Sequence, residues 1–213
     1  MSALEGLKRA VDEYDAAAAA GYARQAVAEG IDPVDAFDAM TMAIKSIGDD
    51  FEAGIRWLPD LIGAADAMKA AAPILEEALE ARGGTRQSVG TVVAGTVQGD
   101  IHSIGIEMVC TLLVAAGFEV HYLGIDVPAA RFVEAVREKG ADIVALSALL
   151  TVTSAEDKKV IRLLNEAGLR DQVKVMVGGG AINADFAANI GADGYEPAAP
   201  GAVELAKTFV GAA

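Results

Sequence analysis

The feature that most constrains the fold is a change of hydrophobic pattern near the middle of the 213-residue chain. Up to about residue 81, apolar residues recur at helical spacing and no strand pattern is convincing. From residue 89 on, short, strongly apolar runs alternate with helical segments. Between the two patterns, residues 82–88 contain adjacent glycines flanked by polar side chains, which indicates a linker. We therefore expect two domains, over residues 1–84 and 88–213.

The first domain is predicted to be an antiparallel four-helix bundle, because its helical segments follow one another with short connections. Ser2 is placed to cap the first helix, and Asp32-Pro33 is typical of the start of the third. The fourth helix, over about residues 58–81, contains Pro73, which we expect to kink or split it.

The second domain is predicted to alternate strands and helices. The expected strands are 89–97, 119–125, 143–149, 173–177 and 194–196, and the expected helices are 104–116, 128–139, 155–167, 184–190 and 200–210. Ser154 and Asn183 are the expected caps of two of these helices. The alternation implies a Rossmann-like (flavodoxin-like) α/β fold with a five-stranded parallel sheet. The strands are strongly apolar, as burial on both faces of such a sheet requires.

Composition limits the partners. Seventeen basic and 31 acidic residues give a net charge of −14, which disfavours nucleic acids and anionic membrane surfaces. Cys110 is the one cysteine and cannot form an internal disulfide, and the N-terminus shows no secretory signal. No apolar run is long enough to span a bilayer. We expect a cytoplasmic protein with no nucleic-acid partner and no membrane partner.

The loop Gly99-Asp100-Ile101-His102-Ser103-Ile104-Gly105 carries the candidate chemistry. It lies between a buried strand and a helix, at the strand end where open α/β sheets bind their ligands. Asp100 and His102 are two residues apart and point to the same side of an extended chain. A carboxylate beside an imidazole fixes which ring nitrogen carries the proton, and it leaves the other nitrogen free to bind a metal.

Two further strand ends carry unusual residues. Ser147, Leu149, Thr151 and Thr153 share one face while the chain stays extended, and buried hydroxyls need a backbone or ligand partner. Gly178-Gly179-Gly180 follows the next strand, and such glycines either let the backbone approach a bulky group or form a flexible turn.

Several ligand classes are disfavoured. The first strand is followed by neither Gly-x-Gly-x-x-Gly nor a Walker-type motif, which argues against dinucleotide and P-loop binding. A structural zinc site needs more ligands than His102, His121 and Cys110 supply. One well-oriented histidine instead suits a metal already held by a macrocycle.

Three motifs together resemble a known family. Asp100-x-His102-x-x-Gly105, Ser147-x-Leu149 and Gly178-Gly179, in this order, resemble the cobalamin-binding domains of corrinoid-dependent methyltransferases, including that of methionine synthase. The helical half resembles the cap module of this family, in Ile47-Gly48-Asp49-Asp50-Phe51-Glu52 and Trp57-Leu58-Pro59-Asp60-Leu61. The resemblance is nearest to the small corrinoid proteins of methylamine, methanol and O-demethylase methyltransferase systems.

The resemblance implies cobalamin as cofactor and assigns roles to individual residues. His102 is implied as the lower cobalt ligand, with Asp100 hydrogen-bonded to its other nitrogen and Thr153 near this pair or the nucleotide tail. The implied cofactor-binding residues are Gly99, Asp100, Ile101, His102, Ser103, Ile104, Gly105, Ser147, Leu149, Thr151, Thr153, Gly178 and Gly179, together with Phe51, Leu58 and Leu61, which resemble the apolar residues over the upper face of the cobalt.

The implied function is that of a corrinoid methyl carrier. It accepts a methyl group on cobalt(I) from a substrate-specific methyltransferase, and it presents the group to a second corrinoid-dependent methyltransferase that loads a pterin or thiol. On this interpretation the chain is a subunit of a methyltransferase system rather than a self-sufficient enzyme. The alternatives are a cobalamin-dependent sensor or regulatory module, the cobalamin subunit of a carbon-skeleton mutase, and an α/β binding domain without a cofactor.

Overall fold

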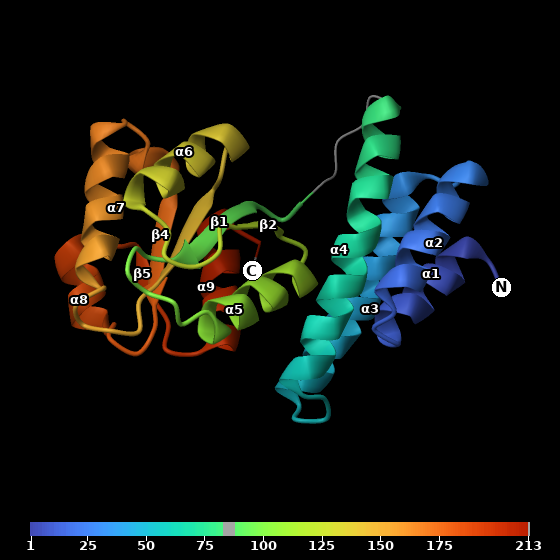
Figure 1. The fold of residues 1–213 in the computed structure, drawn as a ribbon, viewed down its shortest axis with the longest axis horizontal. Coiled ribbons are helices and arrows are strands. Elements are labelled where there is room, and N and C mark those ends of the chain that lie inside the picture. The colour runs from blue at the N-terminus through green and yellow to red at the C-terminus, as the bar shows by residue number, and fades with distance from the viewer. Residues whose placement is uncertain (83–87, 213) are drawn as a thin grey trace. The chain divides into compact units, whose positions relative to one another are not determined.

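The computed structural model describes residues 1–82 and 88–212, apart from the side chain of Glu52. It divides the chain into two compact units, Met1–Gln87 and Ser88–Ala213 (Figure 1). Most of the linker expected from the sequence, residues 83–87, lies outside the described residues.

The first unit, as far as it is described, is a bundle of four helices. They are α1 (Ala3–Asp12), α2 (Ala16–Ala28), α3 (Pro33–Glu52) and α4 (Leu58–Ala81). Helix α1 packs against α2 and α3, and α4 packs against the same two helices, so the four helices enclose one core.

The helix starts of the bundle follow the sequence, and Pro73 does not split its helix. The Ser2 hydroxyl accepts the Glu5 N–H at 3.3 Å, and the Glu5 carboxylate accepts the Ser2 N–H at 2.9 Å. Helix α4 runs through Pro73 as one element, so of the two effects expected of this proline, a kink or a split, the split is wrong. Ala71 and Leu75, on either side of Pro73, are both fully buried, and their packing holds the two halves together.

The second unit is a doubly wound α/β fold, as the sequence predicts. Its described strands are β1 (Thr91–Thr96), β2 (Glu119–Tyr122), β3 (Ile143–Ser147), β4 (Lys174–Gly178) and β5 (Gly194–Tyr195), all paired in parallel in the order β2-β1-β3-β4-β5. The helices are α5 (Ile104–Ala115), α6 (Ala129–Lys139), α7 (Ala155–Glu166), α8 (Ala184–Ile190) and α9 (Ala199–Val210), with a short 3₁₀ turn, η1 (Arg170–Gln172).

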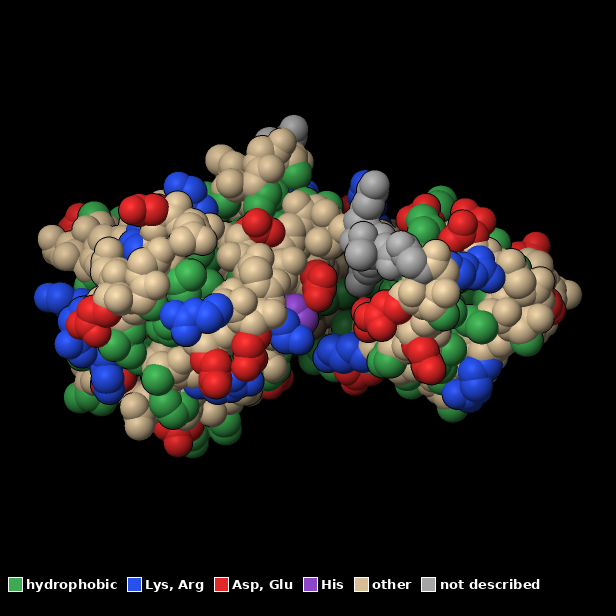
Figure 2. Space-filling model, turned by 90° about the horizontal axis from the view of Figure 1, so that it is seen from above, with side chains coloured by type: hydrophobic (Ala, Val, Ile, Leu, Met, Phe, Trp, Pro, Cys, Tyr) green, Lys and Arg blue, Asp and Glu red, His purple; other side chains and the backbone are tan. Residues whose placement is uncertain are grey.

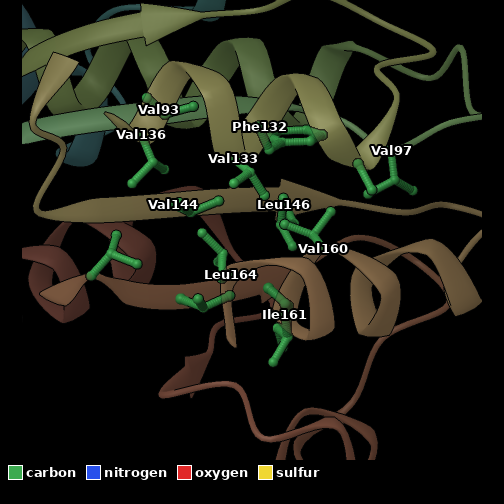
Figure 3. Close-up of a cluster of buried hydrophobic side chains, with 14 of the residues drawn as sticks. Val93, Val97, Phe132, Val133, Val136, Val144, Leu146, Val160, Ile161 and Leu164 are labelled. Carbon is green, nitrogen blue, oxygen red and sulfur yellow. The ribbon is translucent and has the colours of Figure 1, made fainter. Parts of the chain in front are cut away.

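The core of this unit lies between the sheet and its helices. Helix α5 packs against α9, and α6 packs against α7. Side chains of α6 and α7 meet those of β1 and β3 in a closely packed cluster that includes Val93, Val97, Phe132, Val133, Val136, Val144, Leu146, Val160, Ile161 and Leu164 (Figure 3). This apolar burial holds the strand ends in place and thereby positions the loops that follow them.

One helix cap and one strand extension differ from expectation. Asn183 caps α8 as predicted, since its side-chain oxygen accepts the Phe186 N–H at 2.8 Å. Ser154 does not cap α7, because its hydroxyl donates to the Thr151 carbonyl at 2.9 Å instead. Strand β3 ends at Ser147, and the N–H groups of Thr153 and Ser154 both bond the Leu150 carbonyl in a turn. The strand expected to reach residue 149 is therefore two residues shorter, and the shared face of Ser147, Leu149, Thr151 and Thr153, which holds only while the chain stays extended, is not formed.

The surface is polar and mixed in charge. Acidic and basic side chains are interspersed over the visible face of each unit, with apolar side chains between them (Figure 2). Among the described residues, none of the helices combines the length and apolar character needed to cross a membrane.

Candidate functional site

The register of the sheet brings the three candidate loops to one edge. Thr96, Ser147 and Gly178 are aligned across β1, β3 and β4 at the carboxyl ends of these strands. The chain turns to opposite sides of the sheet after β1 and β3, and ligands bind at such a switch point. The loops after β1 and β3 are therefore where a ligand is expected.

Asp100 is the centre of the site. It is fully buried, and its Oδ1 accepts the His102 N–H at 3.0 Å and lies 2.8 Å from His102 Nδ1. Its Oδ2 accepts the Leu149 N–H at 2.7 Å and the Thr153 hydroxyl at 2.8 Å. Burial alone raises the pKa of Asp100, but these four hydrogen bonds outweigh it and hold the pKa well below its usual range. Asp100 is thus an ionised carboxylate.

The Asp100 carboxylate fixes the tautomer of His102. An ionised carboxylate only accepts hydrogen bonds, so Nδ1 is the ring nitrogen that donates to it, and in the neutral imidazole the lone pair is then on Nε2. The His102 side chain is 45% exposed. The structure therefore presents one oriented ring nitrogen, Nε2, at the surface of the α/β unit, as a metal ligand requires.

Two residues that were not expected from the sequence, Thr96 and Asp126, form hydrogen bonds with the backbone of the loop of residues 99–105. The Thr96 hydroxyl donates to the Asp100 carbonyl at 2.7 Å, and the Asp126 N–H bonds the same carbonyl at 2.9 Å. The Asp126 carboxylate accepts the Gly99 N–H at 2.6 Å, and the φ of Gly99 is +84°, where glycine is favoured. Thr96 could have been predicted from the sequence, because it places a hydroxyl at the end of a buried strand. Asp126 could not, because nothing in the sequence distinguishes it from other aspartates in loops.

A cavity of about 740 Å³ lies beside His102. Its volume is within the range of small-molecule sites, about 300–1,000 Å³. The lining residues are Ile101, His102, Ser103, Ile104, Gly105, Ser147, Leu149, Gly179, Gly180, Ile182, Tyr195 and Pro197. The first seven and Gly179 are among the implied cofactor-binding residues, Gly180 was noted only as part of the glycine run, and Ile182, Tyr195 and Pro197 were not expected.

The other residues of this unit that were implied as cofactor-binding do not line the cavity. Asp100 and Thr153 belong to the hydrogen-bond network that orients His102, and Gly99 forms the turn before Asp100. Thr151 is exposed, with its carbonyl bonded to the Ser154 hydroxyl. Gly178 is not among the residues that line the cavity, and a Cβ there would meet the Glu196 carbonyl oxygen at 3.3 Å.

Gly179 and Gly180 shape the cavity wall for different reasons. Gly179 has φ +107°, and a Cβ on it would lie 2.3 Å from the Ala148 carbonyl oxygen. Glycine is therefore required at 179 by the close approach of two backbones, whether or not a ligand is bound. A Cβ on Gly180 would lie 2.8 Å from the Leu149 side chain, so a side chain there would displace a cavity residue.

The three residues selected in the helical unit differ in exposure. Phe51 and Leu58 are half-buried, whereas Leu61 is fully buried in the bundle and offers no surface to a cofactor. The turn between α3 and α4 instead exposes Trp57, at 74%, and Ile55. Arg56 holds this turn by an ion pair with Asp50 at 3.3 Å and a hydrogen bond to the Tyr14 hydroxyl. Trp57 could have been selected from the sequence, because a tryptophan in a turn with polar neighbours is unusual.

The site suits a metal that brings most of its own ligands. Within residues 1–82 and 88–212, no three His, Cys, Asp or Glu side chains are grouped so as to hold a bare ion. His102 offers one free nitrogen beside a cavity large enough for an organic group. These donors fit a metal complex that needs one axial protein ligand.

Comparisons with known proteins agree with this chemistry. Two family models, each described as a B12 binding domain, match residues 90–204 and 3–76. The trimethylamine corrinoid protein 1 of Methanosarcina acetivorans is 43% identical over 95% of this chain and 94% of its own. The dimethylamine corrinoid protein of Methanosarcina barkeri is 45% identical over 80% of each chain. The methanol:cobalamin methyltransferase complex MtaBC of M. barkeri matches with a TM-score of 0.85 and 30% identity, over 99% of this chain and 80% of that one.

Proposed function

Since the chain belongs to the family of B12-binding corrinoid proteins, we propose that it is a methyl carrier that receives a methyl group from one methyltransferase and presents it to a second. Cobalamin is its cofactor. The observation that carries the proposal is the Asp100–His102 pair, in which a buried, fully hydrogen-bonded carboxylate leaves Nε2 of an exposed imidazole free beside a 740 Å³ cavity.

The α/β unit supplies the residues that hold the cofactor. His102 Nε2 would bind the cobalt, and Asp100 would orient the ring and favour the tautomer whose Nε2 lone pair is available to the metal. The cavity beside His102 receives the nucleotide tail, with Ser147 and Tyr195 as hydrogen-bonding groups and Gly179-Gly180 as its backbone wall. Bound in this way, the corrinoid supplies a cobalt centre that accepts a methyl group and releases it again.

Apolar side chains around His102 exclude water from the metal. Ile101, Ile104, Leu149, Leu150 and Val152 are all exposed in this structure, and exposed apolar side chains around a ligand nitrogen fit the flat face of a macrocycle. In the helical unit, Trp57 and Ile55, with the half-buried Phe51 and Leu58, provide the apolar surface that shields the methyl group between transfers. We assign this role to the exposed Trp57 rather than to Leu61, which is fully buried.

The partners follow from the carrier role. The chain needs a substrate-specific methyltransferase as donor and a second methyltransferase, with a pterin or thiol acceptor, as recipient. Methylated amines are the first donors to test, because two of its similar relatives are named trimethylamine and dimethylamine corrinoid proteins. The net charge of −14 favours partner surfaces with basic patches.

The test is methyl transfer with the cobalamin-loaded full-length protein. It is reduced, mixed with a methylamine-specific methyltransferase and trimethylamine or dimethylamine, and followed by the absorption change that accompanies methylation of cobalt. We expect methylation with at least one donor and return to the starting spectrum when an acceptor methyltransferase is added. A protein that binds cobalamin but is methylated by no donor system, methanol included, contradicts the proposal and favours a sensor.

A further inference from the structure

Asp157 is a buried carboxyl group that the proposed function does not use. It lies in the first turn of α7, and no part of it is exposed to solvent. Neither of its carboxyl oxygens has a hydrogen-bond partner among the described residues. A buried carboxyl without hydrogen bonds destabilises a fold unless it stays protonated, so its place beside the Asp100 network calls for an explanation.

The charged neighbour of Asp157 is Asp100. Strands β1 and β3 carry no ionisable side chain, and Glu156 and Lys159 on α7 pair with each other at 3.0 Å. Within the described residues, the ionisable side chains on the other elements packed against α7 form no ion pair or hydrogen bond with Asp157; they are Arg131, Glu134, Arg137, Glu138 and Lys139 on α6, Arg170 and Asp171 on η1, and Asp185 on α8.

The two buried carboxyls therefore divide their charge unequally. Asp100 accepts four hydrogen bonds and stays ionised, whereas Asp157 accepts none. Burial, and next the charge of Asp100, raises the pKa of Asp157 to about 8. Two groups whose surroundings push their pKa values apart in this way are typical of functional sites.

A turn links Asp157 to the histidine network. The Glu156 N–H bonds the Thr153 carbonyl at 2.9 Å, and the Asp157 N–H bonds the Ser154 carbonyl at 3.2 Å. The Thr153 hydroxyl is one of the four donors to Asp100. Asp157 therefore follows a donor to Asp100 by one turn of chain, and its charge acts on Asp100 through space.

We propose that Asp157 is a positioning residue for the axial histidine, protonated at neutral pH, which adds a second negative charge beside Asp100 when it releases its proton to solvent at alkaline pH. The proposal rests on the role of His102 as cobalt ligand. A negative charge near the metal stabilises the more positive oxidation state. The midpoint potential of the cobalt(II)/cobalt(I) couple therefore becomes more negative as Asp157 ionises.

The charge state is tested first, on the full-length protein without cofactor. Infrared difference spectra between wild type and Asp157→Asn are recorded from pH 6 to pH 10. We expect the carbonyl stretch of a protonated carboxylic acid in the wild type at pH 7, with loss of the band near pH 8. Asp185→Asn, which removes an exposed aspartate from the first turn of α8, is the matched control and leaves the band unchanged. Absence of the band in the wild type at pH 7 overturns the proposal.

The coupling to the metal is tested on the cobalamin-loaded protein. We expect the cobalt(II)/cobalt(I) potentials of wild type and Asp157→Asn to show the same pH dependence below pH 7, and the wild-type potential to fall below that of the variant by pH 9. Equal potentials at pH 9 overturn the proposal even if the infrared band is present. If Asp157→Asn does not fold, Asp157→Ala takes its place. The infrared result does not depend on cobalamin, so failure of His102 ligation is distinguished from failure of this inference.

Discussion

The two units bury different kinds of side chain. All seven buried polar or charged side chains of the described residues lie in the α/β unit: Thr96, Asp100, Thr111, Ser147, Thr153, Ser154 and Asp157. The core of the helical unit consists of alanine and larger apolar residues, and its polar groups are at the surface. Burying polar groups is costly unless they are hydrogen-bonded, so they are retained where they position something.

The difference in buried polar side chains indicates where each unit carries its function. In the α/β unit the functional groups are inside, in the network that orients His102. In the helical unit the interior serves packing alone, and any contribution to the cofactor must come from exposed side chains such as Trp57 and Ile55. Substitutions in the two units should therefore separate stability from cofactor chemistry.

The largest effect is expected for Asp100→Ala. It leaves the Leu149 N–H and both His102 donors without their acceptor, whereas the Thr153 hydroxyl keeps the Leu150 carbonyl at 2.8 Å. We expect a loss of about 3–5 kcal/mol of unfolding free energy together with loss of axial ligation. Urea unfolding and the cobalamin absorption spectrum measure the two effects. Asp66→Ala in the helical unit, which removes an exposed ion pair with Lys69, is the control; an equal loss in both variants contradicts the account.

Leu75→Ala in the helical core should destabilise without changing cofactor chemistry. Leu75 is fully buried in α4, and truncation of such a side chain costs about 2–5 kcal/mol. We expect lower stability of the helical unit in urea but unchanged cobalamin affinity and spectrum. A changed axial ligation in this variant would break the division of roles between the units.

Asp157→Asn should change the pH dependence of stability. The pKa of Asp157 is raised to about 8 in the fold, so the unfolded chain loses this proton first and the unfolding free energy of the wild type falls as pH rises from about 4 to about 8. The variant lacks this fall. The buried amide of the variant also lacks hydrogen-bond partners, and this cost offsets part of its advantage. We therefore expect the variant to be more stable than wild type by about 2 kcal/mol at pH 8 and no more stable at pH 4. Parallel stability profiles from urea unfolding contradict this expectation.

The smallest effect on stability is expected for Trp57→Ala, because Trp57 is 74% exposed and such substitutions change stability by about 0.5 kcal/mol or less. Its effect on the methyl group should be larger: we expect faster photolysis of bound methylcobalamin at unchanged affinity. Ile62→Ala, which truncates an exposed apolar side chain of α4, is the control. In the wild type, bound cobalamin should also quench the fluorescence of Trp57, the single tryptophan of the sequence. An unchanged photolysis rate removes Trp57 from the proposed shield.

The fold and the central pair were predictable from sequence for physical reasons. Parallel strands buried on both faces are apolar throughout, and the helices between them show their own spacing and caps, so the order of elements is visible. Carboxyl ends of parallel strands meet at one edge, which brings the loop of Asp100 and His102 beside the segment that follows Ser147 without knowledge of the tertiary structure.

Other features depend on tertiary context. The hydroxyl-rich segment after Ser147 suits an extended strand, but it turns at Leu150, and Thr153 reaches Asp100 only because of that turn. Asp157 and Glu156 look alike as first-turn acids of a helix, and burial alone distinguishes them. Leu61 lies at helical spacing with Ala65 and Met68, which suits the bundle core, but the resemblance implied a place over the cofactor, and its full burial decides for the core.

The central claim is that a protein nitrogen binds the cobalt, and electron paramagnetic resonance of the cobalt(II) form tests it most directly. Full-length protein is prepared with ¹⁵N-labelled histidine and loaded with unlabelled cobalamin; His121→Gln excludes the only other histidine. We predict that the nitrogen splitting changes from the ¹⁴N triplet to the ¹⁵N doublet, and that His102→Ala abolishes the change. A splitting that stays a triplet in the labelled protein means that no histidine binds the cobalt, and it contradicts the account.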